Sequence, residues 1–152
     1  MSPRSVTHAT FTIERVYPAS VARVYAAFAD KNAKRRWFSG PPEWGPEEHE
    51  LDFRVGGREF SAGGPVGGQR HIMNALYYDI VPEQRIVWTY EMHLDDTRIS
   101  VSLNTVTFHP EGKGTRLVFT EQGTYIDSHA SDGPDLRQQG TEGLLDQLGA
   151  SL

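Results

Sequence analysis

Hydrophobic and polar residues alternate over much of the chain, which is the pattern of strands with one buried face. In the segment 6–17, this alternation places Phe11, Ile13 and Val16 near one face. Later segments alternate in the same way and predict further strands of an antiparallel sheet: 50–55, 71–81, 85–92, 98–110 and 114–125. The short segments between them are rich in glycine, proline or acidic residues, as expected for hairpin turns.

The apolar period lengthens at two places in the chain, and both changes predict helices. Behind the candidate N-cap Ser20, apolar residues recur at i, i+3, i+4 and i+7: Val21, Val24, Tyr25 and Phe28. Asp30 can cap a second short helix, whose apolar face holds Ala33 and Trp37. Near the C-terminus, leucines at i, i+4 and i+8 predict a further helix: Leu144, Leu148 and Leu152.

The alternation also predicts which strand residues point toward the core. Residues 50–55 turn three apolar side chains inward: Leu51, Phe53 and Val55. Residues 71–81 turn Asn74 inward together with four larger side chains: Ile72, Leu76, Tyr78 and Ile80. Residues 85–92 share one apolar face: Ile86, Trp88, Tyr90 and Met92. In 98–110 the apolar phase changes, which predicts a β-bulge near residues 104–105, between Ile99, Val101 and Leu103 on one side and Val106 and Phe108 on the other.

The order of these elements predicts the fold class. One strand is followed by two short helices, about six antiparallel strands and a C-terminal helix. A bent sheet with one apolar face can bury that face under the terminal helix, which gives an α+β two-layer architecture. The chain has 152 residues, enough for a hydrophobic core, so we expect a single domain over residues 1–152.

The composition restricts the partners that the protein can have. Its 15 Lys and Arg residues stand against 20 Asp and Glu, and the formal charge of -5 disfavours binding to nucleic acid. The chain has no cysteine, which excludes disulfides and thiolate nucleophiles. It has no apolar run of membrane-spanning length and no apolar core of a signal peptide near its N-terminus. We therefore expect a cytoplasmic protein that binds neither nucleic acid nor membranes.

The segment 30–44 tests that expectation, because it combines basic residues with two tryptophans. A basic run with interleaved aromatic residues can bind nucleic acid. The same residues fit an amphipathic helix in which Trp37 is buried while the basic side chains remain in solvent: Lys34, Arg35 and Arg36. The negative charge of the whole chain favours the second interpretation.

Residues with catalytic or metal-binding chemistry are sparse. The i, i+4 helical spacing of zinc motifs does not occur among the histidines considered, so we expect neither a metal nor a cofactor: His71, His93, His109 and His129. Glu121 is the one candidate acid or base, because alternation places it on the face of Leu117 and Phe119, where burial would raise its pKa. Asn74 and Tyr90 are its candidate partners. The alternative is a carboxylate at a strand end that accepts backbone hydrogen bonds.

Four segments in this order resemble the START-like (SRPBCC) superfamily, in the branch of the activator of heat-shock protein 90 ATPase homologues: TFTIERVYPASVARVYAAFADKNAKRRWF, DFRVGGREF, YDIVPEQRIVWTYE and GTRLVFTEQG. The resemblance implies a helix-grip fold, in which a curved antiparallel sheet of about six to seven strands wraps around a long C-terminal helix, with an apolar cavity between them. Gly140 and Gly143 indicate that this helix lies close to another element. Members of the branch often carry tryptophan after the helix glycine, whereas Thr141 follows Gly140 here, which leaves the shape of one cavity end open.

The resemblance also implies which residues line the cavity and bind a ligand: Trp37, Phe38, Phe53, Tyr78, Trp88, Tyr90, Phe119, Leu144 and Leu148. A solid core built from the same side chains is the alternative. The favoured hypothesis is a protein that binds a small apolar or aromatic ligand. The second is a cyclase-like or hydrolase-like enzyme that uses Glu121, His93 or Tyr90. The third is a chaperone-interacting module, which is less favoured because the eukaryotic activators add an N-terminal domain for which this chain has no room.

Overall fold

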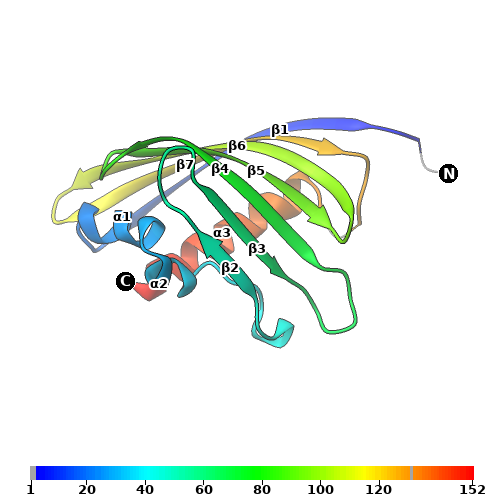
Figure 1. Cartoon of the computed structure of the whole chain (residues 1–152). Helices are drawn as coiled ribbons and strands as arrows, with labels where there is room; N and C mark the ends of the chain where they lie inside the picture. Colours follow the sequence, from blue (N-terminus) through cyan, green and yellow to red (C-terminus); the bar gives the residue numbers. More distant parts are fainter. Residues whose placement is uncertain (1–2, 131) are drawn as a thin grey trace.

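The computed structural model describes residues 3–130 and 132–152. Its main feature is an antiparallel sheet of seven strands in the order β1-β7-β6-β5-β4-β3-β2 (Figure 1). The strands are β1 (Val6–Tyr17), β2 (Glu48–Leu51), β3 (Arg58–Gly63), β4 (His71–Val81), β5 (Arg85–Leu94), β6 (Thr97–Glu111) and β7 (Gly114–Ile126). From β2 to β7 each strand pairs with its neighbour in sequence, and β1 joins the sheet by pairing with β7. The predicted antiparallel sheet is confirmed.

Two short helices, α1 (Val21–Ala29) and α2 (Lys31–Arg35), follow β1, and a 3-10 turn, η1 (Pro42–Trp44), precedes β2. Both predicted caps are present. Ser20 Oγ accepts a hydrogen bond from the Arg23 amide at 3.2 Å, and Asp30 Oδ1 accepts one from the Ala33 amide at 2.9 Å. Each cap satisfies an amide that the first helical turn leaves without a backbone partner, and so fixes where its helix begins.

The C-terminal helix α3 (Pro134–Ser151) lies beneath the curved sheet (Figure 1). Leu145 and Leu148 of this helix are buried in the core, and the Tyr17 hydroxyl donates a hydrogen bond to the Leu145 carbonyl at 2.7 Å. The sheet and this helix form the predicted α+β helix-grip architecture. In the part of the chain that the structure describes, none of the helices is long and apolar enough to cross a membrane.

Up to Tyr77, strand β4 turns inward the face opposite to the one that the sequence predicts, whereas Ile80, beyond the register shift, packs against the core as predicted. Met73, Ala75 and Tyr77 are buried, whereas Asn74 and Tyr78 are exposed. The prediction was wrong because two tyrosines are adjacent here and the register with β5 shifts between Tyr77 and Asp79. A shift of one residue exchanges the faces of a strand, so alternation alone cannot assign the inward face next to it.

Val16 and Val55 were also predicted to point inward, and both are exposed. In β1 the buried position is the neighbouring Tyr17. Strand β2 ends at Leu51, and the chain then turns through Gly56, whose φ of 82° is a left-handed conformation that suits glycine. Val55 lies in this turn, where the alternation of a strand no longer applies.

Strand β6 carries three polar residues on its inward face: Ser100, Ser102 and Asn104. Val101 and Leu103 point outward and are 40% and 37% exposed. The predicted bulge near residues 104–105 was wrong, because β6 pairs there regularly with both neighbouring strands. The register shift lies instead between Met92 and His93 of β5. The alternation of β6 therefore continues unbroken past Asn104, and it brings polar groups inside.

The basic residues of α2 do not all lie in solvent. Arg35 and Arg36 are exposed, as predicted, but the Lys34 side chain is only 4% exposed and forms an ion pair with Glu59 of β3 at 2.6 Å. Lys34 and Trp37 are three residues apart and both are buried, and Trp37 Nε1 donates to the Ala27 carbonyl of α1 at 2.9 Å. The prediction that Lys34 lies on the solvated face was wrong.

Candidate functional site

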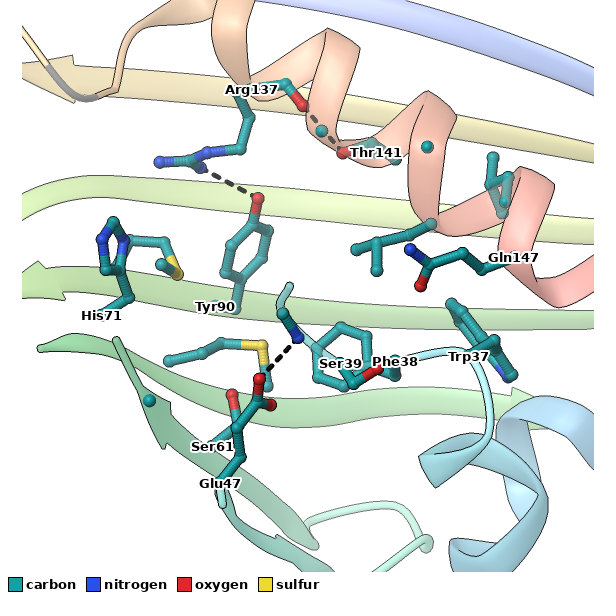
Figure 2. A pocket seen from close by; sticks show the side chains of 18 of the residues that line it. Trp37, Phe38, Ser39, Glu47, Ser61, His71, Tyr90, Arg137, Thr141 and Gln147 are labelled. Carbon is teal, nitrogen blue, oxygen red and sulfur yellow. Dashed lines mark hydrogen bonds between the residues drawn. The ribbon is translucent and has the colours of Figure 1, made fainter. Parts of the chain in front are cut away.

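A cavity of about 610 Å³ lies between the sheet, α3 and the segment that follows α2 (Figure 2). This volume is typical of pockets for small molecules. Six of the predicted ligand-binding residues line it: Trp37, Phe38, Trp88, Tyr90, Phe119 and Leu144. The exposed Leu136 of α3 and the exposed Pro41 also line it, so the cavity opens to solvent between α3 and the segment after α2.

The other three predicted ligand-binding residues lie outside the cavity lining. Phe53 packs edge to face against Tyr25 and Tyr77, with ring centroids 6.0 and 5.1 Å apart. Tyr78 is 56% exposed, because β4 presents its neighbour Tyr77 to the interior. Leu148 is completely buried within the core.

Helix α3 contributes small residues to the cavity wall: Gly140, Thr141 and Gly143. A Cβ atom added to Gly140 or Gly143 would meet no described atom within 4 Å, so the expected close approach at these glycines was wrong. Their missing side chains leave open space instead. Thr141 lines the cavity, and its hydroxyl donates to the Arg137 carbonyl at 3.0 Å (Figure 2). The wall that α3 forms here is therefore built from small residues.

Arg137 of α3 holds a buried polar cluster at the cavity wall. Its side chain is 9% exposed and donates to the Tyr90 hydroxyl at 2.9 Å (Figure 2). It also donates to Ser100 Oγ at 2.8 Å and to Asp132 Oδ2 at 2.6 Å. The Tyr90 hydroxyl donates in turn to the Glu121 carboxylate at 2.8 Å. We refer to these five residues as the Arg137 cluster.

Glu121 is 1% exposed, which confirms the prediction that it points inward. Burial raises the pKa of this carboxyl, and the charge of Arg137 and hydrogen bonds from Tyr90, Asn104 and Ser102 offset only part of the effect. Of the two predicted partners, Tyr90 is confirmed, whereas Asn74 is exposed. A buried carboxyl that retains its proton more readily is a candidate proton donor or acceptor.

A second buried cluster joins α2 to β2, β3 and β4. Glu59 accepts hydrogen bonds from Lys34 Nζ at 2.6 Å and from the Tyr77 hydroxyl at 2.8 Å, and its other oxygen lies 2.8 Å from His49 Nε2. Burial acts to raise the pKa of Glu59, but the Lys34 charge and the hydrogen bonds of His49, Lys34 and Tyr77 outweigh it and lower the pKa to about 2. Glu59 is therefore ionised, and its charge is compensated within the fold. We refer to these four residues as the Glu59 cluster.

The two buried glutamates are expected to give opposite pH dependences of stability. The pKa of Glu59 lies at about 2 when folded, below its ordinary 4.5, so Glu59 stabilises above pH 4.5 and loses this effect as the pH falls toward 2. That difference corresponds to roughly 3 kcal/mol. The pKa of Glu121 is raised, so Glu121 becomes destabilising as the pH rises above 4.5. Urea unfolding between pH 3 and 8 measures both effects.

Two variants separate these contributions, Glu59→Gln and Glu121→Gln. The stability of the wild type relative to Glu59→Gln should increase between pH 3 and 6, because only the wild type gains a favourable charge. Its stability relative to Glu121→Gln should decrease as the pH rises, while both variants remain folded. If the stability of the wild type relative to each variant changed in the same direction with pH, the opposite effects given to Glu59 and Glu121 would be wrong.

Glu47 lies on the wall of the cavity across from Arg137 (Figure 2). Its Oε1 atom accepts a hydrogen bond from the Gly40 amide at 2.5 Å. The neighbouring Trp44 is stacked on His71, with ring centroids 4.8 Å apart, and both rings line the cavity. A carboxylate and an aromatic pair therefore occupy one side of the cavity.

The four histidines considered for metal binding are dispersed. His71 stacks on Trp44, His109 Nε2 bonds to Thr107 Oγ1 at 2.9 Å, and His129 Nε2 bonds to the Ile126 carbonyl at 3.1 Å. His93 lies in β5. Within residues 3–130 and 132–152, no three His, Asp or Glu side chains are grouped so that they could hold a metal ion.

The sequence analysis missed five charged residues that line the cavity: Lys34, Glu47, Glu59, Asp132 and Arg137. Arg137 contacts Tyr90, 47 residues away, and Lys34 contacts Glu59, 25 residues away, so local spacing carries no sign of either pair. The one available signal was the alternation of β6. If the alternation is continued without a bulge, it places Ser102 in the interior, where its hydroxyl needs a buried polar partner, and that partner is Glu121.

The sequence matches the family model described as Activator of Hsp90 ATPase homolog 1-like protein over residues 18–152. The chain belongs to this family. A solved structure from Rhizobium leguminosarum is 46% identical, with a TM-score of 0.91, and the match covers 99% of this chain and 97% of that one. The Mll3558 protein from Rhizobium loti is 48% identical, with a TM-score of 0.88, over 97% of this chain and 99% of that one.

The fold extends to more distant members of the family. An AHSA1-like protein from Aeromonas hydrophila is 22% identical, with a TM-score of 0.68, and the match covers 94% of this chain and 91% of that one. At this identity the likeness concerns the fold alone. Among curated proteins, no relative matches the chain.

Proposed function

We propose that this protein binds a small, mainly apolar molecule in the cavity between the sheet and α3. The observation that carries the proposal is the unfilled volume of about 610 Å³ beside aromatic and aliphatic side chains. Such pockets bury most of the surface of a small ligand, and this burial provides the main favourable free energy of binding. The proposed ligand contacts are the six residues that the sequence predicts and that line the cavity: Trp37, Phe38, Trp88, Tyr90, Phe119 and Leu144.

Polar groups in the wall are suited to orient such a ligand. Asn104 lines the cavity, and its Oδ1 atom is buried without a hydrogen-bond partner among the described residues. A buried acceptor without a partner costs about 1 to 3 kcal/mol, so a donor supplied by a ligand or by water would be favourable. The Tyr90 hydroxyl lies on the same side, fixed by Arg137 and Glu121.

A neutral aromatic probe tests the proposal. We expect 1-naphthylmethanol to bind with a Kd of about 10 µM, which corresponds to roughly 7 kcal/mol. Isothermal titration calorimetry measures this affinity directly. The Trp88→Leu variant should bind the probe with a clearly different affinity and lose about 3 kcal/mol of stability or less, because Trp88 already borders empty space.

The matched control is Phe108→Leu. Phe108 is as deeply buried as Trp88, but it packs against Tyr25 and Phe28 and is absent from the cavity lining. Its truncation should lower the stability and leave the probe affinity unchanged. The proposal fails if the probe does not bind, or if Trp88→Leu loses more than about 3 kcal/mol without any change in binding.

A second candidate function is catalysis in the same cavity. It rests on Glu121, a cavity-lining carboxyl whose pKa is raised by burial and whose position is fixed by Tyr90. In an enzyme of this kind, Glu121→Gln should retain binding and lose turnover, because the amide preserves the shape but cannot exchange the proton. The family description suggests a chaperone partner only by name, and we do not propose one.

A further inference from the structure

We propose that the ligand carries a protonated amine, which binds the Glu47 carboxylate beside the ring of Trp44. This inference rests on the proposed function, because it names the chemistry of the ligand in the same cavity. It follows from the charges on the cavity wall, from the space that surrounds Glu47, and from the aromatic rings next to it.

The charges on the cavity wall leave Glu47 without a cation. Apart from His71, six residues with acidic or basic side chains line the cavity: Lys34, Glu47, Glu59, Asp132, Glu121 and Arg137. Lys34 is paired with Glu59 at 2.6 Å, and Arg137 is paired with Asp132 at 2.6 Å. Glu47 forms no ion pair with any residue in the ranges 3–130 and 132–152. A cation on the ligand would compensate this charge.

The position of Glu47 is built into the backbone around it. Its Oε1 atom is held by the Gly40 amide. A Cβ atom on Gly40 would lie 2.7 Å from that oxygen, and a Cβ atom on Gly63 would lie 2.8 Å from Glu47 Cγ. Glycines at these two positions therefore make room for the Glu47 side chain, and an ordinary residue at either one would displace it.

Aromatic rings border the carboxylate and suit an ammonium group. The Trp44 ring lies next to the Glu47 carboxylate, since a Cβ atom on Gly40 would lie 2.6 Å from Trp44 Cε3 and 2.7 Å from Glu47 Oε1. The face of a tryptophan attracts cations, most strongly where water is partly excluded. Burial lowers the pKa of the adjacent His71, against the charges of Asp132 and Asp95, so its imidazole is neutral at pH 7.5 and does not compete for Glu47.

An anionic ligand is disfavoured because Arg137, the cation that could bind it, already has hydrogen-bond partners in the protein. Its guanidinium already donates to Asp132, Tyr90 and Ser100, and Glu121 lies 3.6 Å from it. A ligand carboxylate would have to displace one of these partners and would approach two acidic residues, the buried Glu121 and the partly buried Asp132. The formal charge of -5 on the whole chain also favours the approach of a cation.

Three probes of nearly the same shape test the charge of the ligand at pH 7.5: 1-naphthylmethylamine, which is protonated, 1-naphthylmethanol, which is neutral, and 1-naphthoate, which is anionic. We expect calorimetry to show the amine binding at least ten-fold more tightly than the alcohol, with naphthoate the weakest. This comparison needs no substitution, so it does not depend on whether a variant folds.

The Glu47→Gln variant locates the effect. Its amide oxygen can still accept from the Gly40 amide, so the local structure should persist while the charge is lost. The amine should lose about ten-fold in affinity, and the alcohol should be unaffected. Glu50→Gln is the matched control, because Glu50 is exposed on β2 and its substitution changes the net charge equally. Amine binding should be the same in this control as in the wild type.

The possible results separate this inference from the proposed function. If the alcohol binds but the amine binds no more tightly, the proposed function stands and the assignment of an amine is wrong. Tighter binding of naphthoate also overturns it, as does an equal loss of amine affinity in Glu47→Gln and Glu50→Gln. If none of the three probes binds, the proposed function and the inference both fail.

Discussion

Replacing Lys34 with methionine is expected to lower the free energy of unfolding by about 3 to 5 kcal/mol at pH 7. The side chains of Lys34 and Glu59 are 4% and 1% exposed, so the substitution leaves a buried carboxylate without its cation. The hydrogen bonds from His49 and Tyr77 compensate only part of that charge. Urea unfolding at pH 7 measures the loss. It should be smaller at pH 4, where the uncompensated Glu59 takes up a proton.

Two further variants make this prediction specific. Arg36→Met removes an exposed positive charge two residues away and should change the stability by less than about 0.5 kcal/mol. Combining Lys34→Met with Glu59→Gln should recover part of the stability, because the buried charge is then absent. A loss below about 1 kcal/mol for Lys34→Met, well under the range for a broken buried pair, would show that the Glu59 cluster does not stabilise the fold in this way.

Replacing Arg137 with methionine is expected to destabilise the protein by about 3 kcal/mol at pH 7. The substitution retains most of the apolar stem, but it removes the donor that Tyr90, Ser100 and Asp132 share. It also removes the charge that partly offsets the effect of burial on the pKa of Glu121, which should rise further. The stability of Arg137→Met should therefore decrease more steeply than that of the wild type as the pH rises from 5 to 8.

The control for this prediction is Arg116→Met. Arg116 forms an exposed ion pair with Glu14 at 3.2 Å, and such pairs contribute about 1 kcal/mol or less. Urea unfolding of both variants at several pH values provides the comparison. Equal losses in Arg137→Met and Arg116→Met, or parallel pH profiles for Arg137→Met and the wild type, would contradict the role given to the Arg137 cluster.

Where a strand has one uniformly apolar face, the sequence was sufficient to assign its orientation. In β5 the predicted face of Ile86, Trp88 and Tyr90 is buried, and in β7 Glu121 is buried beside Phe119. The sequence also predicted that helices begin after Ser20 and Asp30, because an N-cap hydrogen bond joins a side chain to an amide only three residues away. These features depend on short-range periodicity and local hydrogen bonds, which a sequence shows directly.

Hydrophobicity misled the prediction where the interior is polar. In β6 the apolar Val101 and Leu103 face outward, while Ser102 and Asn104 are buried, and Asn104 lines the cavity. The β6 side chains are buried there because β7 contributes Glu121 and α3 contributes Arg137 to the same side of the sheet. Inward polar residues are tolerated only when partners satisfy them, and those partners lie far away in the sequence.

The sequence by itself determined the family, the order of the helices and of the strands other than β3, and the inward position of Glu121, because these follow from motifs and from regular alternation. Only the tertiary structure decided that Lys34 is buried against Glu59, that Tyr77 rather than Tyr78 faces the interior, and that Arg137 and Glu47 lie on opposite walls of one cavity. The physical reason is that burial and ionisation depend on which distant groups meet. Those contacts arise from the register of the sheet and the position of α3, which no short stretch of sequence encodes.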